Sequence, residues 1–230
     1  MSERRTTRLL ADQLRPLAPL GAVWFAALLL LLAVVAQNVI PYEQLLLDPT
    51  DSGGLPWYAG LVSNLGVLAW TTATVAAIGG AWVSRVAGRE GAASMLRSGA
   101  TLSALLLLDD LFQFHSYLPG QLGFPKAAFY ALYMALTAWW VLSEHRELAR
   151  TNFRLLHAAG FAFATSIAVD QFGVGSVDVS LVLEDAAKFL GVLAWALYFV
   201  VTTMDITRSI IDDRTHLGSA EPREDLVQSQ

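Results

Sequence analysis

The sequence predicts an all-α, polytopic membrane protein, built as a six-helix transmembrane bundle with both termini in the cytoplasm. Three observations support this fold class. First, 55% of the 230 residues are hydrophobic and only 15% are charged, whereas a soluble domain carries about 25% charged residues. Second, the apolar residues are grouped into long runs, the pattern typical of membrane spans. Third, the arginines lie in alternate gaps between these runs.

Six spans are expected, and each is long enough to cross ~30 Å of hydrocarbon at ~1.5 Å per residue. They lie at about 18–40, 57–83, 97–118, 125–143, 153–172 and 180–206. The first run exceeds the ~7–15 apolar residues of a signal peptide and has no cleavage site after it, so we interpret it as a retained span. Residues 1–17 would form a cytoplasmic flank, 18–206 the transmembrane domain, and 207–230 a polar, partly disordered cytoplasmic tail.

The orientation follows from the positions of the basic residues. All of the arginines precede the first span, lie between spans two and three or four and five, or follow span six. On the opposite side, Lys126 is the only basic residue of the loops. Cytoplasmic loops carry the excess of Lys and Arg, so this pattern predicts a multi-pass protein of a prokaryotic inner membrane with both termini inside.

Composition also excludes several classes of function. The chain has no Cys, which excludes disulfides and thiolate chemistry. The net charge is −5 and no basic surface is apparent, so nucleic acid is not an expected partner. Membrane lipid is the expected surrounding, and a small ion or a lipid is the expected substrate. A homo-oligomer is compatible with this composition.

Charged residues inside the predicted spans are the principal candidates for function. They come from spans three and six and fall in the outer half of the membrane: Asp109, Asp110, Glu184, Asp185 and Lys188. Four further polar residues fall in the same layer: Asn64, Gln113, His115 and Asp170. A charge near the bilayer centre costs ~2.5–3.5 kcal/mol on insertion scales, so such groups turn inward, pair or bind a ligand.

Helical spacing predicts how some of these groups meet. Glu184 and Asp185 lie four and three residues before Lys188, so both carboxylates should reach its ammonium. If span three is one continuous helix, Asp109 and Gln113 share a stripe, while His115 is rotated away from the acid pair.

Counting charges gives the functional hypothesis. Five of these residues are acids, since Asp170 joins the four on spans three and six. They face one permanent cation, Lys188, and His115, which is a cation only when it is protonated. A low-dielectric pocket does not hold several uncompensated negative charges, so the cluster should bind a proton or a cation from the outside. Ion- or proton-coupled transport or sensing is the favoured function. The hexapeptide LGVLAW, at 65–70 and again at 190–195, is consistent with the repeats found in transporters.

Two alternatives stay open, and with them whether the chain is an enzyme. The first is a membrane-embedded, metal-dependent hydrolase acting on lipid, with Asp109, Asp110 and His115 as candidate metal ligands. The alkaline ceramidase superfamily works in this way, but the chain lacks its HxxxH pair, so a hard cation held by carboxylates would be expected instead. The second is a retinal protein, since Glu184 and Lys188 are similar to the acid-x-x-x-Lys pattern of microbial rhodopsins, which have seven helices.

Overall fold

The computed structural model describes residues 29, 32–33, 36–38, 53–56, 60–173 and 175–219 of the chain. These belong to two units, Met1–Ala59 and Gly60–Gln230. In the first unit, Leu29, Leu32, Ala33 and Ala36 are helical. Gln37 and Asn38, in the same predicted span, are described and are not helical. The other residues of this span, and the whole predicted N-terminal flank, lie outside the described residues.

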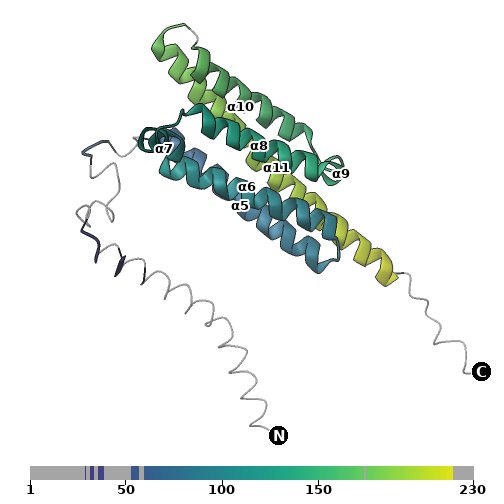
Figure 1. The fold of residues 1–230 in the computed structure, drawn as a ribbon. Helices are drawn as coiled ribbons and strands as arrows, with labels where there is room; N and C mark the ends of the chain where they lie inside the picture. Colours follow the sequence, from purple (N-terminus) through teal and green to yellow (C-terminus); the bar gives the residue numbers. More distant parts are fainter. Residues whose placement is uncertain are drawn as a thin grey trace, which may run out of the picture. The chain divides into compact units, whose positions relative to one another are not determined.

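The second unit is a bundle of helices (Figure 1). Its elements are α5 (Leu61–Val86), α6 (Glu90–Phe112), α7 (Phe114–Leu122), α8 (Ala127–Ser143), α9 (His145–Leu148), α10 (Arg154–Phe172) and α11 (Val177–Ser219). Helix α5 packs against α6 and α11, α11 also packs along α10, and α8 contacts α6. The described part of the chain contains no strand, which confirms the all-α prediction.

Four helices of the described residues are long and apolar enough to cross a membrane: α5, α6, α10 and the stretch Val182–Asp213 of α11. Helix α8 is apolar as well but has only 17 residues, fewer than the ~20 that a span normally needs. Large apolar side chains such as Leu68, Val75 and Trp82 are exposed on the outside of α5, as expected for a helix that faces lipid. The fold therefore supports a membrane protein with at least these four candidate spans.

The third predicted span differs from the observed helices. The sequence predicts one helix over 97–118 that stops at Pro119, but α6 ends at Phe112 and Pro119 lies inside α7. The break falls at Gln113, which has the left-handed backbone conformation with φ 53°. Non-glycine residues adopt this conformation rarely, so the sequence carries no signal for the break. As a result, Asp109 and Asp110 lie in the last turn of a helix and not in the middle of a span.

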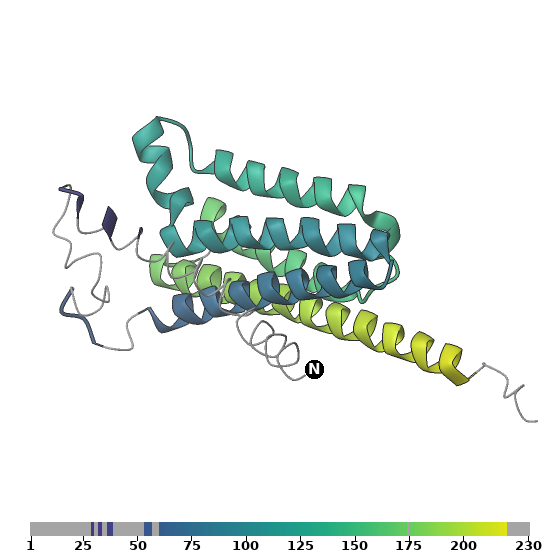
Figure 2. The same cartoon turned by 90° about the horizontal axis from the view of Figure 1, so that it is seen from below.

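The sixth span is longer than predicted at both ends. Helix α11 has 43 residues, about 65 Å at ~1.5 Å per residue, and it extends past its neighbours at its C-terminal end (Figure 2). The predicted cytoplasmic tail thus begins as a continuation of α11 up to Ser219, and the rest of the tail lies outside the described residues.

Aromatic rings fill the middle of the bundle. The Trp70 ring of α5 stacks on Phe163 of α10 at 5.9 Å and meets Trp195 of α11 at 6.0 Å, measured between ring centroids. Trp140 of α8 lies 5.5 Å from Trp195 and is almost fully buried. Trp70 and Trp195 are the last residues of the two LGVLAW copies, so the repeated segments face each other across the core. This aromatic layer separates the polar residues at the two ends of the bundle.

Candidate functional site

A cavity of about 320 Å³ lies at the end of the bundle where α5 and α11 begin and where α6 meets α7. Its polar lining comes from four helices and the loop before α8. The lining includes Ser63, Asp110, Gln113, His115, Ser116, Lys126, Glu184, Asp185 and Lys188. Most of the residues singled out from the sequence are therefore brought together here.

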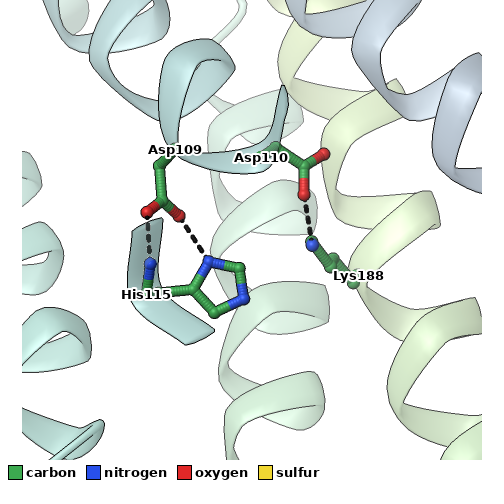
Figure 3. Close-up of polar contacts among 4 residues, drawn as sticks. All are labelled: Asp109, Asp110, His115 and Lys188. Atoms are coloured by element: carbon green, nitrogen blue, oxygen red, sulfur yellow. Dashed lines mark hydrogen bonds and ion pairs between the residues drawn. The ribbon is translucent and has the colours of Figure 1, made fainter. Parts of the chain in front are cut away.

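The closest contact in the cavity is an ion pair between Asp110 of α6 and Lys188 of α11 (Figure 3). The Asp110 side chain is 10% exposed and that of Lys188 is 39% exposed. The spacing places Glu184 and Asp185 within reach of this ammonium, but the ion pair that Lys188 makes is with Asp110 on the neighbouring helix. Opposite charges attract most strongly where water is excluded, which favours the shielded Asp110 over the more exposed acids on α11 itself.

Asp109 points towards His115 and away from the Asp110–Lys188 pair (Figure 3), and it is not among the residues that line the cavity. Its Oδ1 accepts the backbone N–H of His115 at 2.9 Å, and its Oδ2 lies 2.7 Å from His115 Nδ1. The expectation that His115 faces away from both acids is wrong. It assumed a continuous helix, whereas the break at Gln113 folds α7 back so that His115 meets the turn carrying Asp109.

These contacts give Asp109 a structural task. Its carboxylate accepts an N–H at the start of α7, where the helix dipole favours a negative charge. An ionised carboxylate can only accept, so Nδ1 of His115 carries a proton, and Nε2 is the acceptor when the ring is neutral. Asp109 thus fixes the ring of His115, and it is His115, not Asp109, that lines the cavity.

A second ion pair between residues far apart in the sequence lies at the edge of the cavity. Lys126 Nζ donates to Asp170 Oδ1 of α10 at 3.0 Å and lies 5.4 Å from the centre of the Tyr130 ring. Burial opposes the charge of Lys126, which lies outside the spanning helices, but Tyr130 and Asp170 outweigh this and raise the pKa of its amine. Sequence reasoning missed Lys126 as a site residue. The signal was present, since Lys126 is the only basic loop residue on the predicted outer side.

Glu184 and Asp185 are left without an ion-pair partner in the described part of the chain. The charges that act on Glu184 are Asp170, Lys126, Asp185 and Lys188. Each of these two lysines already has an aspartate partner. The cavity therefore holds two satisfied pairs and two further carboxylates on α11.

Of the four supporting polar residues predicted from the sequence, some line the cavity and others do not. Gln113 and His115 line the cavity, and Asp170 lies beside it through Lys126. Asn64 is exposed and does not line the cavity, which its neighbours Ser63 and Gly66 line instead. A Cβ on Gly66 would lie 3.7 Å from Asp110 Oδ2, an ordinary van der Waals distance, so the carboxylate lies close against this turn of α5.

The candidate metal ligands do not converge. Among the described residues, no group of three or more His, Asp and Glu side chains could hold a metal ion. Asp110 is turned towards Lys188, whereas Asp109 and His115 bind each other.

Comparison with known proteins identifies a family. The family model described as "Domain of unknown function (DUF8692)" matches residues 22–202. The chain belongs to this family, and the matched range contains all of the cavity-lining residues. No curated protein and no solved structure matches the chain.

Proposed function

We propose that this member of the DUF8692 family binds a proton or a small cation in the acidic cavity and uses it for ion- or proton-coupled transport or for sensing. It is a multi-pass protein of a prokaryotic inner membrane with six spans, including one at 18–40, and with both termini in the cytoplasm. The arginine pattern supports this orientation. In this orientation, the cavity opens on the extracytoplasmic side.

The observation that carries the proposal is the pair of unmatched carboxylates, Glu184 and Asp185, beside the Asp110–Lys188 ion pair. Neighbouring acids without counter-charges repel each other, and this repulsion is relieved when a proton or a cation binds. Each of the two lysines has a closer aspartate partner, and neither makes an ion pair with a carboxylate of α11 in the described part of the chain. An external cation is the partner that this arrangement lacks.

The remaining residues take defined roles around this site. Asp110 is the shielded acid, and a cation that reaches it competes with Lys188, which would gate or neutralise the site. Gln113 and His115 supply polar contacts from the α6–α7 junction. Asp109 acts indirectly by holding the His115 ring. Competition between an ion and an ammonium for one carboxylate is a simple two-state switch.

Liposomes containing the purified full chain test the proposal. Ion flux, or a spectroscopic response to external pH, should be present in the native protein and lost in Asp110→Asn and Glu184→Gln. Asp212→Asn is a matched control, since Asp212 is exposed and lies towards the other end of α11. Retention of the full response in both cavity variants would overturn the proposal, as would its loss in the control.

A second candidate, hydrolysis of lipid, is favoured by one observation. The His115 ring, fixed by Asp109, lies in the same cavity lining as the Ser116 side chain, and an acid–histidine pair next to a hydroxyl is a typical nucleophilic arrangement. A bound divalent metal that is lost with Asp110→Asn would support the metal-dependent form. The retinal alternative and self-association stay predictions that no observation tests.

A further inference from the structure

A second cavity, of about 610 Å³, lies at the opposite end of the bundle. It is bordered by the start of α6, by α9 and the residues that follow it, and by the C-terminal part of α11. Four charged side chains line it: Arg89, Glu147, Arg150 and Asp205. We call it the arginine cavity. It shares no lining residue with the acidic cavity.

The ion pairs of the arginine cavity are exposed to solvent. Arg150 Nη1 donates to Glu147 Oε1 at 3.0 Å, three residues away, and the Arg150 side chain is 75% exposed. Arg89 Nη2 donates to Asp213 Oδ2 at 2.6 Å, and the Asp213 side chain is 67% exposed. Exposed pairs of this kind contribute little to stability. Each guanidinium can therefore exchange its carboxylate for the anionic group of a ligand.

One wall of the cavity is formed by α11. Thr202 of α11 is 2% exposed, so its hydroxyl is closed to a ligand in the cavity. One turn further along α11, the exposed carboxylate of Asp205 lines the cavity and has no ion-pair partner in the described part of the chain.

The charge balance identifies the class of ligand. Arg89 and Arg150 line the cavity together with the carboxylates of Glu147 and Asp205, and Asp213 pairs with Arg89, so a purely anionic ligand would meet repelling acids and a purely cationic one repelling arginines. A ligand that carries both charges satisfies both sets. A phosphate group suits the arginines because its several oxygens can bind two guanidiniums at once. The cavity also lies where spanning helices end, at the level of phospholipid headgroups.

We propose that the arginine cavity binds a zwitterionic phosphate–amine, the chemistry of phosphoethanolamine. The phosphate binds Arg89 and Arg150, and the amine binds Asp205. The ligand is either the headgroup of a phospholipid or the free compound, and the proposal is independent of what the acidic cavity does.

Native mass spectrometry of the purified full chain tests this proposal. The protein is titrated with phosphatidylethanolamine, phosphatidylcholine and phosphatidylglycerol, and separately with soluble O-phosphoethanolamine. Phosphatidylethanolamine should bind about tenfold more tightly than the other two lipids, because its ammonium offers Asp205 both a positive charge and N–H donors, whereas choline has no N–H and the glycerol hydroxyls have no charge. Binding of the lipid alone assigns the headgroup, and equal binding of the soluble compound assigns the free ligand.

Variants separate the two halves of the ligand. Asp205→Asn should remove the preference for phosphatidylethanolamine while phosphatidylglycerol still binds. Arg150→Gln should weaken the binding of all three lipids. The exposed residues Asp212 and Arg208 do not line the cavity, so Asp212→Asn and Arg208→Gln are matched controls.

Two results would overturn the proposal. One is equal binding of the three lipids by the native chain. The other is an unchanged preference in Asp205→Asn, with a melting temperature equal to that of the native protein. Loss of binding in the Asp212→Asn or Arg208→Gln control would also count against it, because the effect would then follow net charge and not the cavity.

Discussion

The ion pairs at the two ends of the bundle differ in how far they are shielded from water. In the acidic cavity, the ion pairs join residues far apart in the sequence, Asp110 with Lys188 and Lys126 with Asp170, and the carboxylates are mostly shielded. In the arginine cavity, one pair joins Glu147 to Arg150 within a single turn, and the carboxylate of the other pair is largely exposed. Each end has a pair that joins distant parts of the chain, so the difference lies in shielding: shielded charges hold each other, whereas exposed charges can exchange partners.

This difference matters because the consequences of removing one partner are unequal. A shielded carboxylate that loses its cation stays in a low-dielectric site with an uncompensated charge. An exposed side chain that loses its partner turns to water at little cost. The acidic end should therefore be sensitive to single substitutions, and the arginine end tolerant of them.

The largest effect is expected from Lys188→Met. This variant leaves the shielded Asp110 unpaired, so the free energy of unfolding in detergent should fall by about 3 kcal/mol, the lower part of the range for a broken buried pair, because Lys188 itself is partly exposed. Chemical denaturation followed by circular dichroism measures the change. Adding Asp110→Asn to Lys188→Met should restore most of the loss, and no recovery in this double variant would contradict the assignment.

A somewhat smaller loss, about 2 kcal/mol, is expected from Asp109→Asn, because the charged acceptor of two hydrogen bonds from His115 is removed. Hydrogen exchange at the His115 amide should become faster, which reports directly on the start of α7. Asp212→Asn provides the control. Native protection of the His115 amide in Asp109→Asn would show that α7 does not depend on this carboxylate.

Arg89→Gln should cost less than about 1 kcal/mol, because its partner Asp213 is an exposed carboxylate. The same denaturation experiment compares it directly with Lys188→Met. If the two variants lose equal stability, the contrast between the ends of the bundle is wrong.

The smallest effect concerns alkaline pH. The pKa of Lys126 is raised in the folded protein above its ordinary value of 10.5. Its contribution to stability is therefore complete below the unfolded pKa and is lost as pH rises through the folded pKa. The melting temperature of Lys126→Gln should match that of the native chain more closely at about pH 11 than at about pH 8. An unchanged gap between the two proteins would indicate that Lys126 acts through packing alone.

The predictions that succeeded rest on periodicity and composition. The helices and their apolar character follow from long hydrophobic runs, and the span predicted at about 153–172 ends at Phe172, as α10 does. The gathering of Asp110, Glu184, Asp185 and Lys188 at one end followed from their positions along antiparallel spans. The predicted direction of the His115 side chain was wrong. It assumed that His115 lies on the same helix as Asp109, whereas that helix ends at Phe112.

The amino-acid order alone determined the all-helical membrane class and the end of the bundle at which acidic side chains collect, because transfer of side chains between water and lipid depends on residue type and spacing. Which carboxylate meets which cation was decided only by the tertiary structure. Asp109 and Asp110 are adjacent in the chain, yet one holds α7 and the other holds α11, because neighbouring helical residues point about 100° apart and their partners come from elsewhere in the bundle.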